Sequence, residues 1–171
     1  MKHCLIVIDM QTGIFGLKQP VFKKDELIRN VKTALRFARD NGVGIIFTRH
    51  ENNTFLKPGT EAYQIVNDLG VLPGDTVIAK KHPGVFQGTD LDNLLKRDHI
   101  ESVILLGLIS NGCVKDACLS ALQKQYSVIL VKDAHSTFYK NAEKMIDSVN
   151  SQMETAGAFI VPADELEHCL R

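Results

Sequence analysis

The sequence predicts an α/β fold of three layers (α/β/α), a doubly wound parallel sheet of six strands with helices on both faces. Short apolar runs, typical of strands buried on both faces, alternate along the chain with amphipathic stretches of helical spacing. Turn residues and charges separate the runs, and no linker, repeat or low-complexity segment interrupts them. Alternating strands and helices favour a parallel sheet, here with the expected strand order 3-2-1-4-5-6.

The expected strands are rich in Val, Ile and Leu. The first is a nearly continuous apolar run that begins at Cys4 and ends at a charge, Asp9. Turn residues such as those of the Pro73-Gly74-Asp75 segment bound the later runs. The six runs cover residues 4–9, 43–48, 76–80, 102–106, 127–131 and 157–161.

The expected helices have apolar residues on one face. The clearest begins at Asp25, an acidic cap, and is closed by Gly42. Thr89 caps another, which carries Leu91, Leu94 and Leu95. Further helical patterns cover residues 62–69, where a short helix is possible, 114–122, 145–153 and 163–170.

Composition narrows the class of protein. The chain has 171 residues, which predicts a single domain over residues 1–171. Its 20 basic and 20 acidic residues cancel, so a nucleic-acid partner is not expected. No apolar run approaches 18 residues, and Met1-Lys2-His3-Cys4 leads directly into a strand without signal-peptide features. The four cysteines form no CxxC pair, so a reducing, cytoplasmic setting is expected.

Functional residues are expected at the carboxyl ends of the strands, where parallel sheets bind ligands. Asp9, His50, Lys80, Cys113 and Asp133 follow or end these runs. No GxGxxG, GxxxxGK[ST] or GxSxG motif is present, so nucleotide-binding loops and a serine nucleophile elbow are not expected.

Cys113 has the placement of a nucleophile. It follows a loop after the fourth strand, at the predicted first turn of a helix, where partial positive charge favours a thiolate and free N–H groups can hold an oxyanion. Asp9 ends the neighbouring strand and can accept the thiol proton if it is partly desolvated. Lys80, at the end of the third strand, supplies a cation to balance the pair.

Three segments resemble the isochorismatase-like cysteine hydrolases, in the same order along the chain. They are Asp9-Met10-Gln11, the stretch from Lys80 to Leu91, and the stretch from Gly107 to Val114. The resemblance implies Cys113 as the nucleophile, Asp9 as the general base and Lys80 as their electrostatic partner. The lysine of the family lies six residues before a phenylalanine, which selects Lys80 by counting back from Phe86 and leaves Lys81 as the alternative.

The same resemblance implies a cis peptide bond between Leu108 and Ile109. That bond turns the backbone N–H of Ile109, together with that of Cys113, toward the substrate oxygen as an oxyanion hole. Nicotinamidases of this superfamily carry an Asp-x-His metal site after the second strand, where this chain reads Thr48-Arg49-His50-Glu51. A metal, a cofactor and nicotinamidase activity are therefore not expected, and His50 is interpreted as a polar loop residue.

The predicted activity is that of a metal-free cysteine amidohydrolase, which cleaves an amide-type C–N bond of a small molecule through a thioester on Cys113. Gln11, Phe15 and Phe86 are candidate substrate-binding residues, and a homo-oligomer is expected. Two alternatives stay open: an isochorismatase-type hydrolase of enol ethers, and a catalytically silent binding protein. The remaining cysteines and Asp133 are expected to be structural; the cysteines are Cys4, Cys118 and Cys169.

Overall fold

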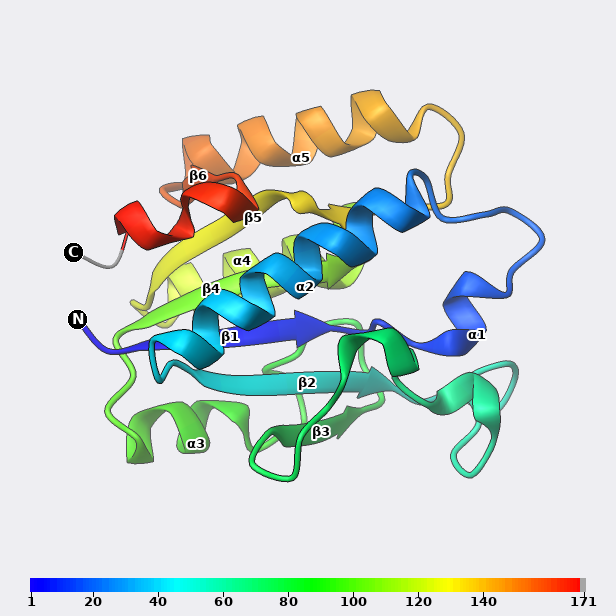
Figure 1. The fold of residues 1–171 in the computed structure, drawn as a ribbon, viewed down its shortest axis with the longest axis horizontal. Coiled ribbons are helices and arrows are strands. Elements are labelled where there is room, and N and C mark those ends of the chain that lie inside the picture. Colours follow the sequence, from blue (N-terminus) through cyan, green and yellow to red (C-terminus); the bar gives the residue numbers. More distant parts are fainter. Residues whose placement is uncertain (170–171) are drawn as a thin grey trace.

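The computed structural model, which describes residues 1–169, confirms the predicted fold class (Figure 1). The sheet has six strands in the order β3-β2-β1-β4-β5-β6. Every neighbouring pair in it is parallel. The strands are β1 (His3–Ile8), β2 (Gly44–His50), β3 (Thr76–Lys80), β4 (Ser102–Leu108), β5 (Ser127–Ser136) and β6 (Phe159–Val161).

Helices cover both faces of this sheet (Figure 1). The α-helices are α1 (Thr12–Phe15), α2 (Lys24–Asp40), α3 (Leu91–Arg97), α4 (Lys115–Gln123) and α5 (Ala142–Ala156). Three 3₁₀ segments, η1 (Glu61–Tyr63), η2 (Asn67–Leu69) and η4 (Ala163–Cys169), and a π turn, η3 (Ser110–Val114), complete the described chain. Among residues 1–169, no helix is long and apolar enough to cross a membrane.

The central strand β1 separates two apolar cores. Leu5 and Val7 belong to the core beneath α2 and η4, whereas Ile6 and Ile8 belong to the core beneath α3, α4 and α5. All four side chains are fully buried. Successive residues of a strand point to opposite faces, so a strand covered on both sides needs an uninterrupted apolar run.

Gly107 allows β4 to lie close to β1 near the carboxyl ends of both strands. Its φ angle is +119°, and a Cβ atom there would overlap the backbone of Ile8. Only glycine combines this left-handed backbone with so close an approach. The glycine therefore brings the carboxyl end of β4 against that of β1.

Several element boundaries differ from those predicted. The segment 62–69 forms two separate 3₁₀ turns instead of one short helix, because a backbone bridge between Gln11 and Ile65 interrupts it. The strands β4 and β5 continue to Leu108 and Ser136 across a register shift that the apolar pattern does not reveal. The terminal helix was expected to reach residue 170, which lies outside the described residues.

Candidate active site

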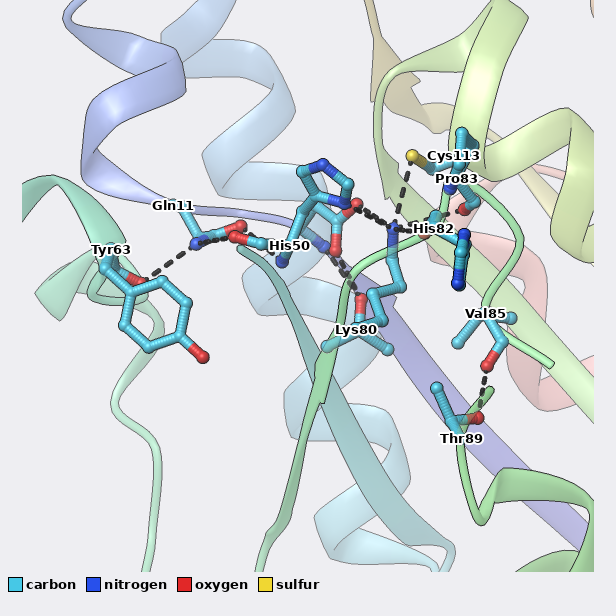
Figure 2. A network of polar contacts seen from close by, with 11 residues as sticks. Gln11, His50, Tyr63, Lys80, His82, Pro83, Val85, Thr89 and Cys113 are labelled. Atoms are coloured by element: carbon cyan, nitrogen blue, oxygen red, sulfur yellow. Dashed lines mark hydrogen bonds and ion pairs between the residues drawn. The ribbon is translucent and has the colours of Figure 1, made fainter. Parts of the chain in front are cut away.

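Lys80 joins Asp9 and Cys113 at the carboxyl edge of the sheet. Its Nζ atom lies 2.7 Å from Oδ2 of Asp9 and 3.4 Å from Sγ of Cys113. Figure 2 shows the lysine ammonium at the centre of this network, with the Cys113 sulfur on one side and the imidazole of His50 on the other. Asp9 and Lys80 are almost completely buried, whereas Cys113 is partly exposed. The sulfur is therefore the member of the group that a ligand can reach.

The long side chain of Lys80 explains how a residue of β3 contacts Asp9 at the end of β1. The two strands lie on either side of β2, about 10 Å apart. Lys80 stands opposite His50 of β2 in the register, and its Nζ also donates to the carbonyl groups of His82 and Pro83, at 3.2 and 3.1 Å. The neighbouring Lys81 is exposed and pairs with Glu51 at 3.5 Å, which places it outside this group.

Thr48 fixes the carboxylate of Asp9. Its hydroxyl donates to Oδ1 of Asp9 at 2.6 Å and accepts the backbone N–H of the same residue at 3.2 Å. Asp9 has a left-handed φ angle of 48°, which turns the chain sharply at the end of β1. The sequence prediction missed Thr48, because its role depends on a contact with the neighbouring strand β1.

The resting charge pattern favours a protonated sulfur beside a charged pair. Burial raises the pKa of the Cys113 thiol to about 12; the carboxylate of Asp9 adds to the rise, and the ammonium of Lys80 opposes it. The sulfur of Cys113 therefore rests as a thiol at neutral pH. The carboxylate of Asp9 lies against the same ammonium as the sulfur.

His50, interpreted from sequence as a polar loop residue, lies against Lys80. Its Nδ1 atom is 3.5 Å from the lysine Nζ. Burial, followed by the charge of Lys80, lowers the pKa of His50, so the imidazole is neutral at pH 7. Because an ammonium only donates, Nδ1 is the acceptor and Nε2 carries the hydrogen.

The turn that carries Cys113 presents backbone N–H groups. The peptide bond between Leu108 and Ile109 is cis. Within residues 1–169, the N–H of Ile109 has no hydrogen-bond acceptor, whereas its carbonyl accepts from Gly112 and Val114. Cys113 belongs to the π turn, and the regular helix α4 begins only at Lys115, after the predicted start. An N–H group without an acceptor is free to donate a hydrogen bond to a ligand oxygen.

The prediction that Gln11 binds substrate needs correction, because its side chain has no exposed surface. Its Nε2 donates to the carbonyl groups of His50 and Tyr63, both at 3.0 Å, and its Oε1 accepts the N–H of His50 at 2.8 Å. The amide of Gln11 therefore ties the end of β2 to η1. It keeps no polar atom for a ligand.

Phe86 was predicted to line the substrate pocket, and its contact with substrate stays a prediction. Its ring stacks on Tyr126 at 6.2 Å between centroids. Tyr126 precedes β5 at the amino end of the sheet, whereas Cys113 follows β4 at the carboxyl end. Phe15 lies on α1, half-buried, with the ammonium of Lys24 5.5 Å from its ring; its contact with substrate stays a prediction.

The remaining candidates have structural contacts. Oδ1 of Asp133 accepts the N–H of Ala163 at 2.9 Å, which ties β5 to η4. Cys4 and Cys118 are buried, and Cys169 is partly buried. The metal site of nicotinamidases does not fit the residues present, because His50 directs Nδ1 at an ammonium. Across residues 1–169, no group of three or more His, Cys, Asp or Glu side chains is arranged to hold a metal ion.

Comparisons with a family model, with protein sequences and with solved structures all find isochorismatase family proteins. The family model described as the isochorismatase domain matches residues 3–161. The isochorismatase family protein YwoC of Bacillus subtilis (strain 168) is 32% identical over 155 residues, which cover 80% of this chain and 79% of YwoC.

Two relatives are named as amide-cleaving enzymes. Nicotinamidase 3 of Arabidopsis thaliana is 25% identical over 97% of this chain and 87% of its own. The ureidoacrylate amidohydrolase RutB of Cronobacter sakazakii is 27% identical over 78% of this chain and 74% of its own. Among solved structures, an isochorismatase from Pseudomonas putida KT2440 superposes with a TM-score of 0.88 at 26% identity, covering 95% of this chain and 89% of that one.

Proposed function

The chain belongs to the isochorismatase family of hydrolases, and from this we propose that it is a cysteine amidohydrolase that cleaves an amide-type C–N bond of a small molecule. One observation carries the proposal: a single buried ammonium, that of Lys80, contacts both a carboxylate and a thiol. The carboxylate is a base for the thiol, and the ammonium stabilises the charges that exist before and after the proton moves.

Acylation begins with proton transfer from Cys113 to Asp9. The thiolate attacks the substrate carbonyl carbon, and a C–S bond forms while the carbonyl oxygen gains negative charge. The N–H groups of Ile109 and Cys113 hold this oxyanion. When the C–N bond breaks, the proton held by Asp9 passes to the departing nitrogen, so that ammonia or an amine leaves and a thioester remains.

Deacylation repeats the two roles of Asp9, first as base and then as acid. A water molecule gives one proton to the Asp9 carboxylate and adds its oxygen to the thioester carbonyl. The C–S bond then breaks, the sulfur recovers the proton from Asp9, and the product leaves as a carboxylic acid. No net proton remains on the site, so Asp9, Lys80 and Cys113 return to their resting state.

The relatives named as amidohydrolases support a C–N bond as the target. A family of this name also allows the hydrolysis of an enol ether, a reaction that releases pyruvate from isochorismate and does not need a thiol. The retained Cys113, in contact with Lys80, favours the amide reaction. A small-molecule substrate, a cytoplasmic location and a homo-oligomer complete the proposal.

The test compares the wild type with Cys113→Ala on a panel of ureides, carbamoyl compounds and primary amides. We expect the release of ammonia or amine to fall at least about a thousandfold. Cys118→Ala, a cysteine buried in α4 away from Lys80, serves as the matched control and keeps the activity. Undiminished amide hydrolysis by Cys113→Ala would overturn the assignment. Pyruvate release from isochorismate that survives in this variant would favour the enol ether reaction.

A further inference from the structure

A buried imidazole lies behind the turn that carries Cys113, and the proposed chemistry does not use it. His135 belongs to the carboxyl-terminal part of β5, opposite Gly107 of β4, and is 3% exposed. Its Nδ1 lies 2.8 Å from the hydroxyl of Ser110, the first residue of the π turn. Its Nε2 lies 2.9 Å from Oδ1 of Asn150 on α5. The side chains of Asn150, His135 and Ser110 thus link α5, by way of β5, to the turn that carries Cys113.

The direction of each hydrogen bond follows from the chemistry of the groups. The side-chain nitrogen of Asn150 donates to the carbonyl of Lys132, so its oxygen is the atom that faces His135. Nε2 of His135 must therefore carry the hydrogen and donate it. In a neutral imidazole Nδ1 is then the acceptor, and the hydroxyl of Ser110 donates to it.

A second hydrogen bond also joins the end of β5 to the π turn that carries Cys113. The hydroxyl of Thr137, a fully buried residue just beyond β5, donates to Oδ1 of Asn111 at 3.1 Å. Ser136, between His135 and Thr137, faces another way and donates to the carbonyl of Phe22 at 2.7 Å. Alternate residues of one segment therefore hold two successive residues of the turn, whereas the residue between them does not.

We propose that Ser110, His135 and Asn150 form a positioning network that fixes the turn between Ile109 and Cys113. The network keeps the Cys113 thiol against Lys80 and Asp9 and holds the free N–H of Ile109 in place. A buried hydrogen-bonded chain of this kind specifies one conformation, because breaking one link leaves its partner unpaired away from water. The inference rests on the proposed role of Cys113, which these residues serve without contact with the substrate.

The test measures how the rate of alkylation of Cys113 by iodoacetamide depends on pH, with the modified peptide identified by mass. A free thiol has its midpoint at about pH 8.5. In the wild type, the midpoint of Cys113 should lie well above this value, because the sulfur is buried beside a carboxylate. Ser110→Ala releases the turn, and we expect its midpoint to fall by at least about one pH unit, toward the free-thiol value. Ser136→Ala, which loses one buried serine hydrogen bond of the same strand, should keep the wild-type midpoint.

Asn150→Ala supplies a second variant on a partly exposed helix position, in case Ser110→Ala fails to fold. It leaves Nε2 of His135 without its acceptor and should shift the midpoint in the same direction. On a hydrolysed amide, either network variant should lower kcat about tenfold and leave KM within about twofold, because only transition-state contacts are loosened. Wild-type midpoints in both network variants would overturn the proposal. Full amide hydrolysis by Cys113→Ala would overturn only the proposed function, since the alkylation profiles remain decisive for the network.

Discussion

The Nζ atom of Lys80 lies 2.7 Å from Oδ2 of Asp9, although β2 separates the strands that carry them. Both side chains are buried, so each charge depends on the other for compensation. The lysine stem crosses the end of β2, and its ammonium meets the carboxylate where β1 turns. The proposed chemistry of Cys113 depends on this ion pair, because the same ammonium also contacts the sulfur.

Lys80→Met should lower the free energy of unfolding by about 3–5 kcal/mol, because it leaves the carboxylate of Asp9 buried without a cation. Urea unfolding at pH 7 measures the change. Lys81→Met is the matched control, since that side chain is 77% exposed, and it should change stability by less than about 0.5 kcal/mol.

The double variant Asp9→Asn, Lys80→Met separates loss of the pair from loss of packing. If the pair is coupled as described, this variant loses less stability than the two single variants together. Strict additivity would contradict the coupling.

Thr48→Val should lower the free energy of unfolding by about 1–3 kcal/mol, because both the N–H and Oδ1 of Asp9 lose a buried partner. A less well oriented Asp9 should also reduce kcat on any hydrolysed amide. Thr155→Val, which removes an exposed hydroxyl bonded within α5, is the control and should stay within about 0.5 kcal/mol of the wild type. Equal effects of the two variants would argue against a role of Thr48 in holding Asp9.

Gly107→Ala should be among the most damaging single-methyl changes in the chain, with a loss of at least about 3 kcal/mol in the free energy of unfolding. The added Cβ overlaps the backbone of Ile8, and the φ angle of +119° is unfavourable for alanine. Gly44→Ala, where nothing lies within 4 Å of the added atom, is the control and should be nearly neutral. Thermal unfolding of both variants decides the comparison.

Stability should fall between pH 6.5 and pH 4 through protonation of His135. Burial lowers the pKa of His135 to about 4 in the folded protein, against about 6.5 in the unfolded chain. The unfolded chain therefore binds more protons in this window, and the contribution of His135, about 3 kcal/mol, is complete above pH 6.5 and disappears toward pH 4. The pKa values of His3 and His50 are lowered as well and act with the same sign.

A comparison of variants isolates this contribution. The free energy of unfolding, measured at several pH values from 7.5 to 4.5, should decline less steeply in His135→Gln than in the wild type. His82→Gln, which changes an exposed histidine, is the control. If all three proteins show the same slope, His135 is not the group that titrates.

The fold was predictable because each strand buried on both faces needs a continuous apolar run, and Leu5, Ile6, Val7 and Ile8 form such a run. The predicted ends of strands were less accurate where backbone hydrogen bonding, and not the apolar pattern, determines the end of the strand. The extension of β5 to Ser136 passes through Lys132 and Asp133, which an apolar pattern interprets as the end of a strand.

The site was predictable as far as it depends on strand ends and on motifs. Lys80 could be chosen over Lys81 by its place at the end of β3, whereas Thr48 could not be recognised, because its role depends on a neighbouring strand. Gln11 was misassigned because its motif position says nothing about burial, and backbone groups of distant segments occupy its amide. The contacts that position a site are long-range, so a linear pattern does not reveal them.

The most direct test of the central claim is the intact mass of the enzyme, quenched in acid while it turns over an amide that it hydrolyses. The account predicts a species heavier than the free enzyme by the acyl group of the substrate less one hydrogen, located on the peptide that contains Cys113 and absent from Cys113→Ala. Amide hydrolysis at the wild-type rate by Cys113→Ala, with no acylated peptide in either protein, would contradict the account.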